Sequence, residues 1–512
     1  MTHEGPQANI PGSGTSAAQG SVALLGSFFI MAVLNYVFAI TMSWLLPVDR
    51  YGMLGVTQTL LLLGGTVVGA GFPWALTSAL SRAPGSADNV GAFRTALVGN
   101  SAIGIVLGAG LCGAGYAGWL PFGPEYRLLL PLASATIVVL AVGAVFTAAL
   151  QGFLRFGALG VVRMSEVVVK FIAGVAAVGL GAGVAGATAG FLAGAVCSMV
   201  LSASLLRNFR FWRGGGWGER QVYAGVFPLF VGMCSLAALV NADIIGLKLA
   251  GPAASADLLA GHYQAAVTLA RIPIFLTLAL FNAVFPYIAQ HAERPDLAGA
   301  YATLALKYTL LFIVPIDIAL IAIPGSVIGF LYPSDYGASA TPLALAALGT
   351  IVLTLVHALT MLLQAAGHVR LPAVVLPASV ILEVVSIAVL VPKLGTNGAP
   401  LAVLIAGGCG VIPLLLVTFR AFRLRLPLAG GLRYLAALAV FGLLLRFVPH
   451  DSRPGLVTAA VCAGTVYVAL LIALGLLTRS DIEKLGEGLG PQIEAASRHV
   501  GRLVERCRVV SR

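Results

Sequence analysis

The sequence predicts an all-α, polytopic membrane protein with about fourteen transmembrane helices, arranged as two parallel six-helix pseudo-repeat bundles plus two extra helices. Three observations lead to this fold class. Hydrophobic residues make up 59% of the 512-residue chain and charged residues only 10%, whereas a soluble globular protein carries roughly 25% charged residues. The apolar runs are long and continuous, which favours helices over the alternating pattern of a membrane barrel. Basic residues gather in alternate loops.

The apolar runs define the individual spans. A helix needs about 20 residues to cross roughly 30 Å of hydrocarbon, and runs of that length recur along most of the chain. The least distinct boundary lies at Gly181–Gly183, where only glycines separate two spans. The predicted spans are residues 20–46, 52–76, 92–117, 128–150, 160–181, 184–206, 221–250, 261–290, 301–330, 338–366, 371–391, 397–419, 431–448 and 455–478.

Loop charges predict the orientation of these spans. Roughly three times as many Lys and Arg residues fall in the loops on one side as on the other, and the alternation holds along the whole chain. Because positively charged loops stay in the cytoplasm, both termini are expected to be cytoplasmic.

Three polar segments lie outside the spans. Residues 1–19 are rich in Gly, Ser and Thr and are expected to be disordered, and residues 207–220 form a basic cytoplasmic linker. In residues 479–512, apolar residues recur every three to four positions among several arginines. This pattern predicts an amphipathic helix on the anionic cytoplasmic leaflet; the alternative is a partly disordered basic tail.

The two halves of the chain correspond to each other at an offset of about 210–217 residues. Gln151-Gly152 matches Ala366-Gly367, and Glu166-Val167-Val168 matches Glu383-Val384-Val385. The repeat predicts an N-terminal bundle at 20–206, a C-terminal bundle at 221–419 and two additional helices at 420–478. Transporters with parallel repeats bind substrate between the halves and alternate access by rocking them.

Four groups of short motifs stand out along the chain, namely Leu45…Tyr51-Gly52, Gly71-Phe72-Pro73, Tyr263…Arg271-Ile272-Pro273…Phe285-Pro286 and Leu331-Tyr332…Leu363-Gln364-Ala365-Ala366-Gly367. They resemble motifs of the multidrug/oligosaccharidyl-lipid/polysaccharide (MOP) flippase superfamily. The most similar branch is the polysaccharide transporters that flip undecaprenyl-linked repeat units, and the resemblance covers about residues 20–420.

The resemblance implies a fold and an activity. It implies two six-helix bundles around a V-shaped cavity, in the bacterial inner membrane, and transport of a lipid-linked sugar without ATP hydrolysis. The sequence agrees in lacking a GxxxxGK[ST] phosphate loop. The expected partners are the lipid-linked substrate, membrane lipids, and the glycosyltransferases and polymerase of a polysaccharide pathway. No nucleic acid, metal or cofactor is expected beyond H⁺ or Na⁺ coupling.

The first span departs from two related branches. Lipid II flippases carry charges there and multidrug transporters often carry an acid, but this span has only Asn35 near its centre. A drug–cation antiporter and a lipid II flippase remain alternatives. A third alternative, a membrane polymerase or glycosyltransferase, is disfavoured by the short outer loops and the absence of a DxD-type cluster.

Charges inside the spans are the candidate functional residues, since a charge at the bilayer centre costs at least about 2.5–3.5 kcal/mol. Arg271, Lys170 and Asn35 are the predicted substrate-binding residues. Arg271 can grip phosphate oxygens bidentately, and Pro273 can kink its span. The alternatives are a structural ion pair for Arg271 and an i,i+4 pair with Glu166 for Lys170.

Three acids are candidates for ion coupling. Glu383 has no charged neighbour one helical turn away and therefore needs a partner across the bundle, a cation or a proton. Asp243, next to Asn241, is either a cation site or a residue of the outer interface, and Glu166 is the third candidate. Lys248 and Asp317 are expected nearer the outer face.

Overall fold

The computed structural model describes residues 14–82, 88–120, 122–207, 227–424, 428–449 and 452–478. All regular structure in these ranges is helical, which confirms the all-α class. Eleven segments are long and apolar enough to cross a membrane, and Ile30–Leu45 is a further, shorter apolar helix. Two of the eleven, Phe156–Leu205 and Arg370–Ala421, each contain two helices that are long enough to cross the membrane separately. The total agrees with the predicted number of about fourteen spans.

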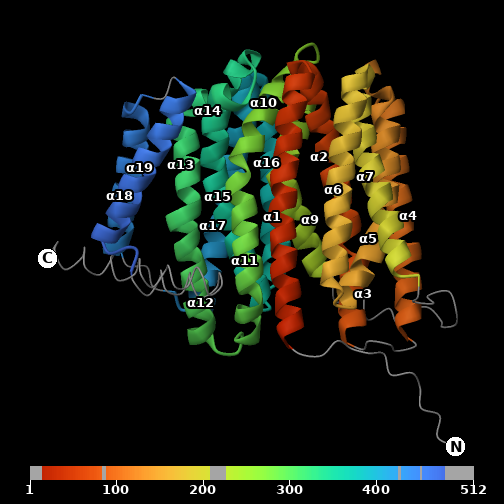
Figure 1. Cartoon of the computed structure of the whole chain (residues 1–512), viewed down its shortest axis with the longest axis horizontal. Helices are drawn as coiled ribbons and strands as arrows, with labels where there is room; N and C mark the ends of the chain where they lie inside the picture. Colours follow the sequence, from red (N-terminus) through yellow and green to blue (C-terminus); the bar gives the residue numbers. More distant parts are fainter. Residues whose placement is uncertain are drawn as a thin grey trace, which may run out of the picture. The chain divides into compact units, whose positions relative to one another are not determined.

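The helices follow the predicted spans closely (Figure 1). α1 begins at Gly14, ahead of the predicted start at residue 20. The predicted basic linker and the predicted C-terminal amphipathic helix lie outside the described residues, apart from Arg207. The helices of the first half are α1 (Gly14–Leu45), α2 (Val48–Ala70), α3 (Phe72–Arg82), α4 (Asp88–Tyr116), η1 (Pro124–Arg127), α5 (Leu129–Gly152), α6 (Phe156–Ala177), η2 (Val178–Ala182) and α7 (Gly183–Leu205).

The second half has more interrupted helices. Its elements are α9 (Phe227–Ala250), α10 (Ala256–Ala270), α11 (Ile272–Gln290), α12 (Pro295–Tyr308), η3 (Thr309–Ile313), α13 (Val314–Ala322), α14 (Pro324–Leu331), η4 (Ser334–Ser339), α15 (Ala340–Ala365), α16 (Arg370–Leu394), η5 (Gly395–Asn397), α17 (Gly398–Ala421), α18 (Leu428–Phe447) and α19 (Arg453–Ala473).

Glycines make the tight turn between α6 and α7. Gly181 and Gly183 have φ of +91° and +54°, a backbone region that glycine enters without a steric penalty. The chain can therefore reverse direction within a few residues, as the sequence predicts for Gly181–Gly183.

Three spans are interrupted just before a proline. α3, α11 and α13 each carry proline at their second position, namely Pro73, Pro273 and Pro315. Proline has no N–H and cannot donate to the carbonyl one turn earlier, so a helix kinks or breaks there. The break at Arg271 agrees with the predicted kink at Pro273, whereas the turn before Pro315 widens into the π-helical η3.

The chain divides into two compact units. One contains the chain up to Gln264 together with Val369–Ala399, and the other contains Ala265–His368 and the chain from Pro400 onward. The first unit thus includes α1–α7, α9 and α16, and the second includes α11–α15 and α17–α19.

Each unit has its own apolar core. In the first unit, α3, α4 and α5 meet around Leu76, Phe93 and Phe146, with the two phenylalanine rings edge to face at 5.6 Å. In the second unit, α18 and α19 pack on α13 around Phe441 and Tyr467. Burial of these side chains stabilises the helix packing within each unit.

Candidate functional site

Helices α6 and α7 approach closely because glycines line their contact. A methyl group on Gly190 would lie 2.6 Å from the Cα of Gly174, and one on Gly194 would lie 2.6 Å from the carbonyl oxygen of Glu166. Small residues allow this close approach between membrane helices. The contact fixes the part of α6 that carries Lys170, whose Cβ lies 3.1 Å from the methyl position of Gly194.

Lys170 occupies an enclosed site made by three helices of the first unit. Its side chain on α6 is 7% exposed. The ammonium group donates to Oδ1 of Asn35 on α1 and lies 5.0 Å and 4.9 Å from the ring centres of Phe38 and Phe191. Rings at this distance attract a cation through their quadrupoles. The structure therefore brings together two of the three predicted substrate-binding residues.

Asn35 is held in the orientation that receives the lysine. Its Nδ2 donates to the carbonyl oxygen of Met31 at 2.8 Å, one turn earlier on α1. Since the amide group is planar, this bond directs Oδ1 away from the helix backbone and toward Lys170. The lysine is thus held by a neutral oxygen and two aromatic faces, and it forms no ion pair with any described residue.

Glu166 does not form the i,i+4 pair with Lys170 that the sequence offered as an alternative. Its carboxylate lies 3.4 Å from the guanidinium of Arg163, three residues earlier on α6. Spacings of three and four residues both place side chains on one helix face, and here the partly exposed Arg163 is the contact. The i,i+4 pairing that would have neutralised Lys170 is therefore not the one formed.

Asp243 is a buried acid with defined hydrogen bonds. It lies on α9, is 3% exposed, and accepts the hydroxyl of Tyr263 at 2.7 Å and the N–H of Ile244 at 2.9 Å. Tyr263 belongs to the part of α10 that lies in the same unit. These bonds hold the carboxylate inside the unit rather than at an exposed surface.

Glu383 is completely buried on α16, which packs against α9. The two helices run in the same direction (Figure 1), and a methyl group on Gly246 would lie 2.8 Å from Cδ1 of Ile387. Asp243 and Glu383 lie one turn before these two contacting residues, on the same helix faces. Two of the predicted acidic residues therefore lie at one level of the α9–α16 contact, while Glu166 lies elsewhere, on α6.

Arg271 marks the break between α10 and α11. It is the residue before the first turn of α11, it is half-buried, and its N–H donates to the carbonyl oxygen of Val267 at 3.0 Å. It belongs to the second unit, whereas Lys170 and Asn35 belong to the first. Its predicted role in binding substrate stays a prediction.

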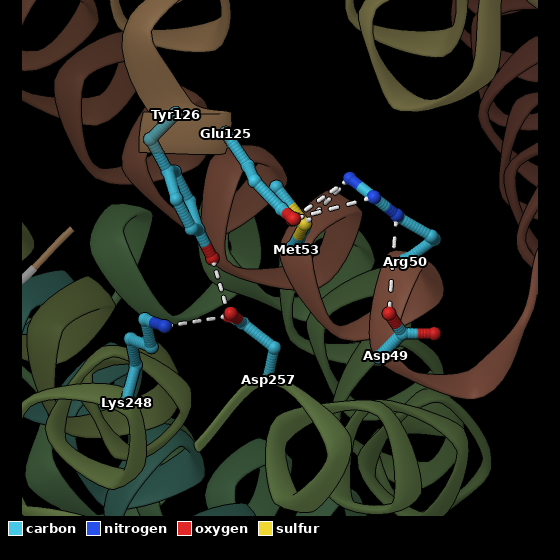
Figure 2. Close-up of polar contacts among 7 residues, drawn as sticks. All are labelled: Asp49, Arg50, Met53, Glu125, Tyr126, Lys248 and Asp257. Atoms are coloured by element: carbon cyan, nitrogen blue, oxygen red, sulfur yellow. Dashed lines mark hydrogen bonds and ion pairs between the residues drawn. The ribbon is translucent and has the colours of Figure 1, made fainter. Parts of the chain in front are cut away.

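A polar network at one end of the first unit was not predicted from the sequence (Figure 2). Asp257 at the start of α10 accepts from Lys248 and from the Tyr126 hydroxyl, both at 2.8 Å. Lys248 also lies 5.2 Å from the centre of the Tyr126 ring. Beside this cluster, Arg50 on α2 pairs with Glu125 at 2.8 Å. The network joins α2 and η1 to the ends of α9 and α10.

The backbones of α2 and α10 meet beside this network. A methyl group on Gly261 would lie 1.9 Å from the carbonyl oxygen of Val48, and one on Gly52 would lie 2.0 Å from that of Asp257. Part of the sequence signal was present, because Tyr51-Gly52 belongs to one of the motifs noted above. Its contact with Asp257 joins segments far apart in the chain, and one sequence cannot reveal it.

The described residues contain no group of three or more His, Cys, Asp and Glu side chains that could hold a metal ion. Besides the ion pairs Lys248–Asp257 and Arg163–Glu166, the described spans hold the buried charges Lys170 and Asp243, which have amide, hydroxyl and aromatic neighbours. Such an arrangement can bind ions and head groups.

Comparison with known proteins then identifies the family. Residues 17–292, from α1 to just after α11, match the model of the polysaccharide biosynthesis protein family. The chain belongs to this family. No curated protein matches the sequence.

Solved structures show that this family member has the fold of MOP transporters. The lipid II flippase MurJ, in an inward closed conformation, superposes with a TM-score of 0.68 at 16% identity, covering 88% of this chain and 98% of MurJ. An inward-facing multidrug resistance MATE family transporter gives 0.58 at 14% identity, covering 79% and 99%. A MOP superfamily transporter from Pyrococcus furiosus gives 0.56 at 14% identity, covering 80% and 95%. The predicted membership of the MOP superfamily and the multi-pass membrane fold are thereby confirmed.

Proposed function

We propose that the chain flips a lipid-linked oligosaccharide, carried on undecaprenyl pyrophosphate, across the bacterial inner membrane by alternating access. Membership of the polysaccharide biosynthesis family and the transporter fold support this proposal. The chain acts by binding and moving its cargo, without catalysis. The glycosyltransferases and polymerase of the same pathway would supply and consume that cargo.

Lys170 is the observation that carries the proposal. An ammonium group in a membrane span is costly to bury, and here Asn35 and two phenylalanine rings surround it without a carboxylate in contact. Such a site keeps its positive charge available to an anion. A pyrophosphate head group is an anion that a lipid-linked sugar brings into the membrane.

The other predicted residues have complementary roles in this proposal. Arg271 binds phosphate oxygens, and Asn35 positions the Lys170 ammonium group. Asp243 and Glu383, at one level of the α9–α16 contact, bind the coupling H⁺ or Na⁺. Glu166, paired with Arg163, balances the charge in the middle of α6.

The test of this function is transport by the purified full chain in vesicles, with a fluorescent undecaprenyl-pyrophosphate oligosaccharide as the probe. We expect Lys170→Gln to reduce flipping about tenfold or more, because the site loses its charge but keeps similar volume. Lys393→Gln is the matched control, since Lys393 is exposed at the end of α16. Equal flipping by the two variants would contradict the role of Lys170.

Two alternatives have the same fold. The likeness to MurJ favours a lipid II flippase, and the likeness to MATE transporters favours a drug–cation antiporter. The same vesicles distinguish them when loaded with lipid II or with a cationic dye. If the protein transports lipid II or the dye but not the oligosaccharide, the proposed cargo is wrong and the corresponding alternative holds.

A further inference from the structure

Asp317 is a buried acid that the proposed function does not use. It lies on α13 in the second unit, with its side chain completely covered. Neither carboxyl oxygen has a hydrogen-bond partner among the described residues. An ionised carboxylate in such a place would lose its hydration without compensation, which costs several kcal/mol in real proteins.

Among the described residues, the helices packed against α13 bring no positive charge to Asp317. Helices α15 and α18 pack against α13. The only titratable side chain on α15 is that of His357, whose two ring nitrogens have no partner among the described residues, and α18 and α19 contribute Tyr434 and Tyr467. The arginines of α18 and α19 and Tyr287 of α11 are exposed. These surroundings therefore favour the neutral, protonated form of the Asp317 carboxyl group.

The backbone hydrogen bonding of the span is interrupted just before Asp317. Tyrosine side chains from the last two helices donate to carbonyl groups at this interruption. Pro315 has no N–H for the carbonyl of Leu311, and η3 widens the preceding turn. The Tyr467 hydroxyl donates to Leu311 O at 2.9 Å, and the Tyr434 hydroxyl donates to Leu310 O. Single π-helical turns of this kind often occur at functional sites.

Helix α18 also lies close to α13 beside the acid. A methyl group on Gly442 would lie 3.3 Å from Cγ2 of Ile318, the residue after Asp317. An apolar cluster containing Val314, Ile318 and Phe441 continues this contact. Separation of α18 and α19 from η3 and α13 would thus remove part of the cover of Asp317 and free the two tyrosine-bonded carbonyls.

We infer that Asp317 is a proton-binding site, protonated while α18 and α19 cover it and ionised when they move away. In uptake, an O–H bond forms on the carboxylate while one breaks in a hydronium ion, leaving water; release is the reverse. The binding of this proton is independent of the cargo. Its coupling to transport rests on the proposed function.

The direct test is infrared spectroscopy of the purified full chain in lipid vesicles at about pH 7, where an ordinary carboxyl group is ionised. We expect the C=O stretching band of a protonated carboxylic acid in the wild type. Asp317→Asn should remove that component, and Asp335→Asn, at an exposed position in η4, should leave it. A band unchanged by Asp317→Asn would overturn the inference.

A separate variant tests whether α18 and α19 cover Asp317. In the double variant Tyr434→Phe/Tyr467→Phe, the bonds to Leu310 and Leu311 are lost, and we expect the band to weaken as water reaches Asp317. An unchanged band in this folded variant would overturn the role of α18 and α19 in covering the acid.

A second measurement, made on the wild type, tests the inference even if Asp317→Asn does not fold. Because the folded wild type keeps its proton more firmly than the unfolded chain, its unfolding temperature should fall as the pH rises from about 6 to about 9. Asp317→Asn, if it folds, should show a smaller fall; a wild type without any fall would contradict the inference. If the C=O stretching band of Asp317 is present but the protein does not transport the oligosaccharide, only the proposed function is contradicted. If the protein transports the oligosaccharide but lacks the band, only the proton site is contradicted.

Discussion

At the residue scale, the side chains that contact the Lys170 ammonium group are neutral rather than acidic. Lys170 is bonded to the oxygen of Asn35, and the nearby Glu166 is engaged by Arg163. An acid in place of Asn35 would form an ion pair with the lysine and remove the net positive charge of the site. Asparagine therefore holds the ammonium group while leaving it attractive to an anion.

Asn35→Asp tests this directly. We expect the new carboxylate to pair with Lys170, so that the protein folds with an unfolding temperature within a few degrees of the wild type. Flipping of the oligosaccharide should fall about tenfold or more, because a neutralised site loses roughly 1.4 kcal/mol or more of affinity for phosphate. The measurements are vesicle transport and thermal unfolding, with Asn35→Gln as the neutral control. Wild-type transport by Asn35→Asp would show that this charge is not used.

At the element scale, close helix contacts position the polar groups. The α6–α7 contact depends on Gly174, Gly190 and Gly194, and the α2–α10 contact depends on Gly52 and Gly261. In both places the atoms that face the glycines include backbone atoms, which cannot move aside as a flexible side chain can. Helix separation is therefore the only response to a larger residue.

Gly190→Val should destabilise the first unit. Its side chain would meet backbone atoms of Gly174 and the carbonyl oxygen of Lys170 within 3 Å, and overpacking of this kind costs about 1–3 kcal/mol. We expect a lower unfolding temperature and weaker transport, since α6 would be displaced from α1. Gly157→Val is the control, because a methyl group there meets no atom within 4 Å. Equal unfolding temperatures for the two variants would argue against a tight α6–α7 contact.

At the scale of the whole molecule, hydropathy predicted most of the helix positions because the membrane imposes one requirement on every span. The Gly181–Gly183 turn and the break before Pro273 were also predictable, since they follow from backbone chemistry at one or two residues. Lys170 and Asn35 could be selected as polar residues in apolar spans. Their direct contact could not, because it depends on how α1 and α6 face each other.

Other features were missed because they depend on which of several possible neighbours a side chain contacts. The pairing of Glu166 depended on a choice between two neighbours at similar helical spacing. Asp257 could be recognised as part of a polar network only once Tyr126 and Lys248, from other elements, lay beside it. The level shared by Asp243 and Glu383 likewise follows from the packing of α9 on α16.

The orientation of the whole chain remains a prediction from its loop charges. We expect a fluorescent protein fused to the C-terminus to fold and fluoresce in the cytoplasm, and alkaline phosphatase inserted between α18 and α19 to be active outside it. The reverse insertion, with phosphatase at the C-terminus, is the control and should be inactive. Phosphatase activity at both positions would contradict the predicted topology.

The hydrogen bond between Lys170 and Asn35 determines how many water molecules a bound cargo must keep. An ammonium group has three N–H donors, and Asn35 accepts one of them, so at most two remain for a ligand. A diphosphate has more acceptor oxygens than two such donors can satisfy. Its remaining oxygens need water or other cations, so a head group held at Lys170 alone would pass through the protein partly hydrated rather than fully stripped of solvent.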